Sequence, residues 1–275
     1  MDLGLSGKVA IVSGGSRGIG LAIATELVRE GARVMLAARS QDDLDVAAAE
    51  LDLIKPGSVD ALSTDMRDVD AVRRLVAATN QRFGPVGIAV SNVIGHVIDA
   101  KKEGAGPGAG TFTTLGPADY RDEFSHLLMS AWALADAAIP GMRLQHWGRI
   151  INIGSGVARE PMKDLPHVLP NTVRPAVAGM YRIMARRLAP DGITVNNILT
   201  GSILTERNRS YWEWLAEQRN LPVEQVRAVM TDSIPARRMG EPIEMAALAT
   251  FLASDLAGNI TGQSIPVDGG INRHL

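Results

Sequence analysis

The sequence predicts an α/β protein with one doubly wound sheet of about seven parallel strands and helices on both faces. Short runs of apolar and β-branched residues alternate with amphipathic segments along the chain. The first of these runs leads through a glycine-rich turn into a helical pattern. No composition break or linker divides the 275 residues, so we expect a single domain over 1–275.

Each strand is expected where a short apolar run is bounded by polar or turn residues. These runs lie at 9–12, 33–37, 59–63, 88–91, 149–153, 194–199 and 264–267. The amphipathic segments between them predict helices over 19–30, 41–53, 68–82, 118–144, 172–189 and 242–253. Strands that alternate with helices favour a parallel sheet, because each crossover places a helix against one of its faces.

Composition excludes several classes of function. The chain has no cysteine, which excludes disulfides, thiolate metal sites and a cysteine nucleophile, and we predict no metal site. A net charge of -2 with 21% charged residues gives no support for binding to nucleic acid or to an anionic membrane. There is no apolar run of about 18 residues and no basic, apolar leader, so we expect a cytoplasmic protein.

The most informative segment is the turn that follows the first strand. Gly14, Gly18 and Gly20 lie between an apolar run and a helical pattern that begins near Leu21. Glycines let the backbone approach phosphates, and the first N–H groups of the helix point at negative charge. The order strand, glycine turn, helix therefore predicts a site for a nucleotide diphosphate. An ordinary strand-to-helix turn is the alternative interpretation.

Several motifs resemble those of the short-chain dehydrogenase/reductase family, in the family's order and over nearly the whole chain. The matching segments are 14–20, 148–155, 192–196, 238–242, 251–255 and 260–270. The first resembles the family's cofactor turn, and the second resembles its fifth strand, which ends on the active-site serine. The resemblance implies a Rossmann-type fold with a cofactor half over about 1–150 and a substrate half over about 151–275.

Two segments interrupt the alternation of strands and helices. Residues 99–117 are rich in glycine and lack periodicity, so they form either a passive surface loop or a substrate-facing one. Residues 202–238 are mostly helical in pattern and follow the sixth strand, at the edge where open α/β sheets bind ligands. We expect them to form a lid. Tyr211, Trp212 and Trp214 within it either pack a small local core or contact substrate.

Charged residues near the second strand favour NADP(H) over NAD(H). A free ribose 2′-hydroxyl is usually bound by a carboxylate at the end of that strand. The sequence Leu-Ala-Ala-Arg at 36–39 offers Arg39 instead, and Arg17 lies in the glycine turn. A guanidinium group suits a phosphate through its fork of donors. A solvated charge is the alternative interpretation of Arg39.

The family resemblance implies further cofactor contacts. Asp65 matches the position that contacts the adenine amine, and Asn92 matches one that lines the adenosine ribose. The family's Asn-Asn-Ala-Gly reads Ser-Asn-Val-Ile-Gly at 91–95, which is a departure. The expected cofactor-binding residues are Gly14, Ser16, Arg17, Gly18, Ile19, Gly20, Arg39, Asp65, Met66, Asn92, Gly201, Ile203 and Thr205.

The family's catalytic pattern is incomplete in this chain. The family uses a serine, a tyrosine, a lysine four residues after the tyrosine, and an asparagine. Ser155 matches the serine, whereas Pro170 and Arg174 stand at the tyrosine and lysine positions. The asparagine position falls at Leu127, or at His126 if one residue is inserted. Arg174 resembles a side branch of the family in which an arginine replaces the lysine.

The remaining polar residues suggest a substitute mechanism. Ser155 can orient a carbonyl or an alcohol, and Arg174 can bind ribose hydroxyls or stabilise an oxyanion. Arginine is always protonated and therefore a poor proton donor. His167 is the best substitute for the tyrosine because its ordinary pKa of about 6.5 suits acid–base work, with a surface histidine as the alternative. Tyr181 lies two turns beyond Arg174, too deep in the helix to act there.

Three functions stay open at this stage. The leading one is an NADP(H)-dependent oxidoreductase acting on a carbonyl or secondary alcohol of a small molecule, without a tyrosine proton donor. The second is a cofactor-binding regulatory or interaction protein, and the third is a redox-neutral enzyme such as a dehydratase or cyclase. The resemblance also implies a homodimer or homotetramer, with which the apolar faces of 127–139 and 176–188 are compatible.

Overall fold

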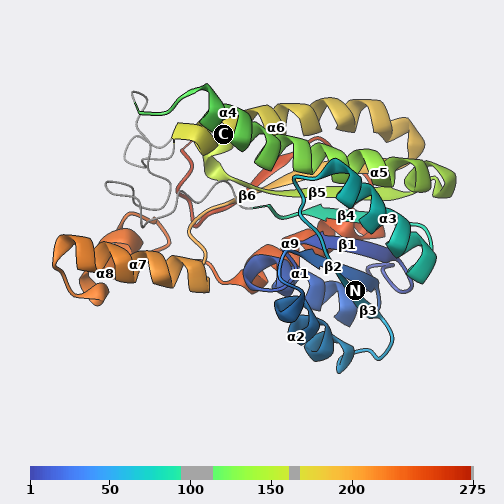
Figure 1. The fold of residues 1–275 in the computed structure, drawn as a ribbon, viewed down its shortest axis with the longest axis horizontal. Coiled ribbons are helices and arrows are strands. Elements are labelled where there is room, and N and C mark those ends of the chain that lie inside the picture. Colours follow the sequence, from blue (N-terminus) through green and yellow to red (C-terminus); the bar gives the residue numbers. More distant parts are fainter. Residues whose placement is uncertain (94–113, 161–167, 274–275) are drawn as a thin grey trace.

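The computed structural model describes residues 1–93, 114–160 and 168–273. The described strands form one parallel sheet of seven strands in the order β3-β2-β1-β4-β5-β6-β7 (Figure 1). The strand order reverses between β1 and β4, so the chain winds outward from this point in both directions. The predicted doubly wound α/β fold is therefore confirmed.

The strands lie where the apolar runs predicted them. Their bounds are β1 Val9–Ser13, β2 Arg33–Ala38, β3 Val59–Ser63, β4 Ile88–Ser91, β5 Gly148–Ser155, β6 Ile193–Thr200 and β7 Ser264–Val267. β5 and β6 pair over their whole length, from Gly148 opposite Ile193 to Ser155 opposite Thr200. The longer β5 thus carries Ser155 to the carboxyl edge of the sheet.

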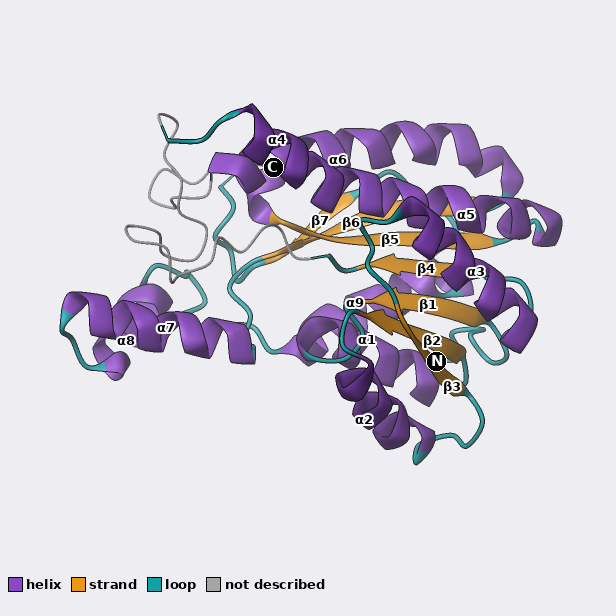
Figure 2. Ribbon diagram, in the orientation of Figure 1, coloured by secondary structure: helices purple, strands orange, loops and turns teal. Residues whose placement is uncertain are grey.

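Helices cover both faces of the sheet (Figure 2). α1 (Gly18–Arg29), α2 (Gln41–Asp52) and α9 (Pro242–Ala253) pack on one face, where Val12 and Leu36 point. The other face, where Ile11 and Met35 point, carries helices from the middle of the chain. These are α3 (Val69–Phe83), α5 (Ser130–Gln145) and α6 (Val168–Leu188). The inner strands β1 and β4 are buried on both faces and mostly apolar, so they were visible in the sequence, whereas the edge strands β3 and β7 are partly exposed.

The predicted helix 118–144 lies within an unbroken helical segment over 117–145, but this segment is not α-helical throughout. α4 (Pro117–Glu123) passes into a π-helical turn over Phe124–Met129, and α5 then begins at Ser130. Insertion of a wide i→i+5 turn changes which side chains face the sheet, and such turns often mark functional positions. α6 begins at Val168, earlier than the predicted residue 172, because Pro170 falls in the first turn, where no N–H is needed.

The segment predicted to form a lid contains two helices, α7 (Glu206–Arg219) and α8 (Val223–Asp232). They project beyond the carboxyl ends of the strands (Figure 1). Trp212 is buried in a small core that includes Ala216, Val226 and Met239. This packing favours the local-core interpretation of Trp212. Most of the glycine-rich loop 99–117 lies outside the described residues.

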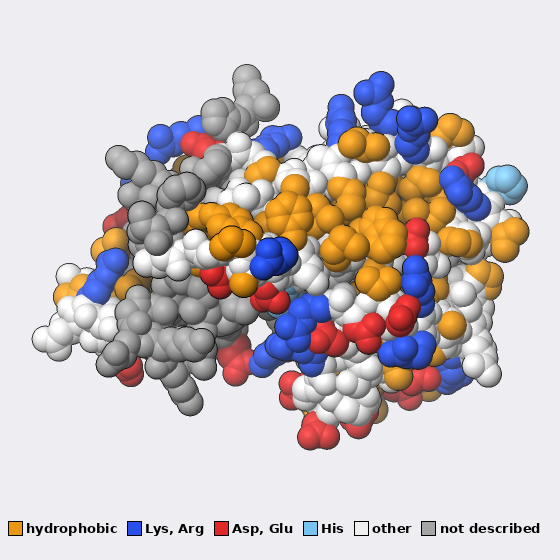
Figure 3. Space-filling view, turned by 45° about the horizontal axis from the view of Figure 1, so that its top comes forward, with side chains coloured by type: hydrophobic (Ala, Val, Ile, Leu, Met, Phe, Trp, Pro, Cys, Tyr) orange, Lys and Arg blue, Asp and Glu red, His pale blue; other side chains and the backbone are white. Residues whose placement is uncertain are grey.

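Hydrophobic side chains gather on the outer surface of α5 and α6 (Figure 3). Ile183 on α6 is 65% exposed and Phe124 in the π-helical turn is 39% exposed. Leu128, Trp132, Met180 and Met184 are only partly buried beside them. Among the described helices, none combines the length and apolar character needed to cross a membrane.

Candidate functional site

The turn between β1 and α1 can be this tight only with glycine at its key positions. Gly14 and Gly18 have φ angles of +61° and +57°, in the left-handed region that favours glycine. A Cβ atom on Gly20 would lie 2.0 Å from the carbonyl oxygen of Gly14. The turn therefore lies directly against the first residues of α1, with no side chain between them.

The N-terminus of α1 is open. Its N-cap residue, Arg17, is extended, and in the described structure no side chain caps the helix. The first turn contains no acidic residue. Ser16 is partly buried, Arg17 is exposed and Ile19 packs against the core under α1. Four backbone N–H groups at a helix start have no partner within the helix, so this end is suited to an anion.

Polar residues join the glycine turn to the end of β4. The Ser13 hydroxyl donates to the Val90 carbonyl at 3.3 Å and accepts from the Asn92 N–H at 2.9 Å. The Asn92 side-chain amide donates to the Gly14 carbonyl at 3.4 Å. Asn92 thus supports the glycine turn in this structure, in addition to any contact that it makes with a ribose.

Arg39 is exposed and follows β2 directly, and Met66, after β3, is buried. Between these strand ends, Asp65 is held by Arg67, a residue that the sequence analysis missed. Arg67 Nη2 lies 2.7 Å from Asp65 Oδ2, and Nε lies 3.1 Å from both carboxylate oxygens. This hydrogen bonding lowers the pKa of Asp65 to about 2. The available signal was an arginine two residues after the aspartate.

The segment after β6 brings the C-terminal half of the chain to the glycine turn. The Gly201 N–H donates to the Val267 carbonyl at 3.1 Å, and Ile203 is 2% exposed. The Thr205 hydroxyl caps α7 by accepting from the Asn208 N–H at 3.4 Å. A Cβ atom on Gly18 would lie 3.7 Å from the Thr205 methyl group. The structure therefore brings Gly18 and Thr205, from opposite halves of the chain, together.

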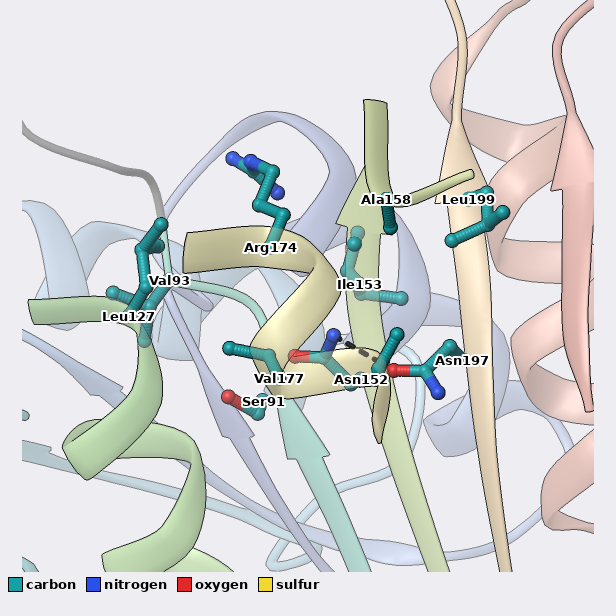
Figure 4. A pocket seen from close by; sticks show the side chains of 12 residues that line it. Ser91, Val93, Leu127, Asn152, Ile153, Ala158, Arg174, Val177, Asn197 and Leu199 are labelled. Atoms are coloured by element: carbon teal, nitrogen blue, oxygen red, sulfur yellow. Dashed lines mark hydrogen bonds between the residues drawn. The ribbon is translucent and has the colours of Figure 1, made fainter. Parts of the chain in front are cut away.

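A small pocket lies beside the end of β5, where Ser155 is paired with Thr200 across the strands. Its volume of about 10 Å³ has room for about one water molecule. The lining side chains come from β4, β5, β6, α6 and the π-helical turn (Figure 4). α6 packs against both the π-helical turn and the short 3-10 helix Gly156–Ala158 that follows Ser155.

The floor of this pocket is polar, whereas its side wall is apolar. Ser91, Asn152 and Asn197 lie opposite one another across three strands, and Asn152 Nδ2 donates to Asn197 Oδ1 at 3.0 Å. Leu127, at the position expected for an asparagine, is 5% exposed and lines the wall. Figure 4 shows Arg174 above this floor, with its guanidinium group directed away from it.

Tyr181 lies deeper, on the buried side of α6. Only 1% of its surface is exposed, and burial raises the pKa of its hydroxyl above the ordinary value. Within the described residues, neither this hydroxyl nor Ser91 Oγ has a hydrogen-bond partner. Pro170 occupies the first turn of α6 and brings no hydroxyl. His167, the predicted proton donor, lies outside the described residues. Among the described residues expected at the catalytic positions, Ser155 and Arg174 therefore carry polar side chains, as does His126, the alternative at the asparagine position, in the π-helical turn.

Comparisons with known proteins cover nearly the whole chain. The family model described as enoyl-(acyl carrier protein) reductase matches residues 14–272. An uncharacterized oxidoreductase of Mycobacterium tuberculosis is 33% identical over 269 residues, covering 97% of this chain and 93% of the relative. L-sorbose reductase from Gluconobacter frateurii, solved with NADPH and L-sorbose, has a TM-score of 0.90 at 31% identity, with 100% of both chains covered.

A further solved structure belongs to a protein with a non-standard catalytic centre. It is the NADPH-bound short chain oxidoreductase of Pseudomonas aeruginosa PAO1, described as containing an atypical catalytic center. Its TM-score with this chain is 0.84 at 31% identity, and 99% of each chain is covered.

Proposed function

This chain belongs to the short-chain dehydrogenase/reductase family, and on that premise we propose that it is an NADP(H)-dependent oxidoreductase with a non-standard catalytic centre. Its substrate is the carbonyl group, or in reverse the secondary alcohol, of a small molecule. The observation that carries the proposal is the intact glycine turn and open helix N-terminus on the sheet edge that also holds Ser155. The Pseudomonas aeruginosa neighbour supports it, because that protein is described as holding NADPH beside an atypical centre.

The described residues fit a phosphorylated dinucleotide. In this proposal Gly14, Gly18 and Gly20 give the pyrophosphate access to the N–H groups of α1. The guanidinium groups of Arg17 and Arg39 bind the 2′-phosphate, because β2 ends without a carboxylate. When bound, the cofactor supplies or accepts a hydride at C4 of its nicotinamide ring.

The remaining cofactor contacts follow from the positions of the strand ends. Asp65, Met66 and Asn92 lie toward the adenosine, while Gly201 and Thr205, with neighbouring Ile203, lie toward the nicotinamide. In this proposal about 1–150 binds most of the cofactor, and about 151–275 binds the substrate, forms the lid and adds the contacts of 201–205. The open N-terminus of α1 and the contact between Gly18 and Thr205 support it.

The chain's own residues then act on the substrate oxygen. Ser155 Oγ donates a hydrogen bond to that oxygen, and the positive charge of Arg174 stabilises the oxyanion that develops on it. Arg174 keeps its proton, and the raised pKa and burial of Tyr181 exclude that hydroxyl as a donor. The proton therefore comes from another group, for which His167 stays our sequence-based prediction.

Turnover tests the proposal directly. We expect NADPH oxidation with at least one member of a panel of ketones, aldehydes and quinones. Ser155→Ala should lower kcat about 100-fold, the loss typical of removing one donor to a developing oxyanion. Ser6→Ala is the matched control, since Ser6 is exposed and precedes β1 at the opposite edge of the sheet.

Two results of this assay would contradict a redox function. If NADPH binds but no panel member is reduced, the result contradicts the proposed reductase and favours a cofactor-binding protein. Conversion of a substrate without net cofactor consumption would indicate a redox-neutral enzyme.

We also propose that the hydrophobic surface on α5 and α6 is covered by a second copy of the chain, giving a homodimer or homotetramer. Exposed apolar patches of this kind are typical of protein interfaces. The exposure of Ile183 and Phe124 supports this assembly. Sedimentation velocity of the wild-type chain and of Ile183→Asp measures it, and a monomeric wild-type chain would contradict it.

A further inference from the structure

The ends of three neighbouring strands each lead to an arginine. Arg17 follows β1, Arg39 follows β2 and Arg67 follows β3. The strands are in register at these ends, with Ser13 opposite Ala37 and Ala38 opposite Ser63. The three arginines are therefore brought to one edge of the sheet by adjacent strands.

Backbone contacts hold these strand ends together. The Gly15 N–H donates to the Ala37 carbonyl at 3.3 Å, and the Thr64 N–H donates to the Ala38 carbonyl at 2.7 Å. The Ser63 hydroxyl donates to the Arg39 carbonyl at 2.9 Å. Because Asp65 follows Thr64, its carboxylate lies at the same edge of the sheet as Arg39.

Asp65 is fully engaged by Arg67 and not by Arg39. Besides its three guanidinium contacts, Arg67 donates its backbone N–H to Asp65 Oδ1 at 3.0 Å. Both side chains are 40% exposed, so their pairing fixes a direction for the carboxylate without burying it. Within the described part of the chain, Arg39 makes no ion pair and its guanidinium stays available.

The charges of Arg39 and Asp65 nevertheless interact. The charge of Arg39 contributes to the lowered pKa of Asp65, although less than Arg67 does. A carboxylate released from Arg67 would therefore turn to Arg39. It would compete with a phosphate for this guanidinium and repel the phosphate's negative charge.

We infer that Arg67 is a positioning residue for cofactor selection: it occupies the Asp65 carboxylate and so keeps Arg39 free to bind a 2′-phosphate. The inference rests on the proposed binding of NADP(H). Arg67 need not touch the cofactor itself, and its loss should weaken ligands that carry the phosphate more than ligands that lack it.

The test is a double-mutant cycle on the affinities for NADPH and NADH, measured by calorimetry at low salt. Arg67→Ala should weaken NADPH about tenfold more than NADH, because both dinucleotides share any contact with Asp65 and NADPH alone needs Arg39 free. Adding Asp65→Asn to Arg67→Ala should restore most of the NADPH preference, because the competing carboxylate is then absent. Arg73→Ala is the matched control, since Arg73 pairs with Asp70 at 3.0 Å on α3 and is exposed.

Three results would overturn the inference. Equal losses for NADPH and NADH in Arg67→Ala, or no loss for either, would contradict a role in selection. If the double variant Asp65→Asn, Arg67→Ala binds NADPH as weakly as Arg67→Ala alone, then Arg67 contacts the phosphate directly. A wild-type chain that binds neither dinucleotide refutes the proposed function instead, and melting temperatures identify any variant that is unfolded.

Discussion

Replacing Gly20 by alanine should weaken the binding of both NADPH and NADH while leaving the fold intact. The added Cβ would lie 2.0 Å from the Gly14 carbonyl oxygen and 2.7 Å from the Asn92 amide nitrogen. Ordinary carbon contacts lie at about 3.5 Å or more, so the carbonyl must move by more than about 1 Å. The turn and the first N–H groups of α1 would then no longer face one phosphate together.

The size of the effect follows from this displacement. Overpacking of this kind costs about 1–3 kcal/mol of stability, which lowers the melting temperature of a domain of this size by a few degrees. The loss of binding should be at least about tenfold, equal to about 1.4 kcal/mol, for both dinucleotides. Both are affected equally because the pyrophosphate is common to them.

Calorimetric titration of folded Gly20→Ala is the assay. Gly141→Ala is the matched control, because a Cβ there lies 3.7 Å from its nearest neighbour, the Pro85 side chain, in ordinary contact within α5. That substitution should leave binding unchanged. A Gly20→Ala protein that melts lower but binds both dinucleotides as tightly as the wild type would refute this account of the turn.

Other changes test other parts of the molecule. Arg149→Met should lower the free energy of unfolding by about 2–4 kcal/mol in denaturant titrations, because the buried guanidinium donates to the carbonyls of Gly148 and Ser254; a change below about 0.5 kcal/mol would contradict this. Trp212→Ala should speed hydrogen exchange across 206–232 while the strands stay protected, since Trp212 fills the lid's own small core; unchanged exchange there would contradict it. Hydrogen bonds from Arg238 hold the pKa of the Glu244 carboxyl at about 2, below its ordinary 4.5. The ionised Glu244 therefore contributes to stability above pH 4.5, and this contribution is lost as pH falls through about 2. In thermal melts over that range, Glu244→Gln should remove this dependence, which is small because solvent screens the exposed Glu244–Arg238 pair; an unchanged slope would argue against it.

The fold could be predicted from the sequence because most of its strands are buried on both faces and even the edge strands β3 and β7 are short runs bounded by turns. Such strands are short apolar runs bounded by turns, and all the predicted ones lie within a few residues of those observed. The glycine turn was equally visible, since Gly14, Gly18 and Gly20 are required by local backbone geometry and by the close approach of α1.

Features that depend on tertiary packing could not be predicted from the sequence. The π-helical turn at Phe124–Met129 lies within an unbroken helical pattern, and no local residue type marks an i→i+5 turn. The row of Ser91, Asn152 and Asn197 depends on the register of three strands that are distant in sequence. The pairing of Arg67 with Asp65 needed only local spacing, but its importance depends on the neighbouring strand end.

The most direct test of the central claim is a titration of the pure wild-type chain with NADPH and with NADH. The account predicts that both bind, with NADPH the tighter, because two arginines and an open helix N-terminus meet at the glycine turn. If neither NADPH nor NADH binds at concentrations up to about 1 mM, the claim that this turn binds a cofactor is contradicted.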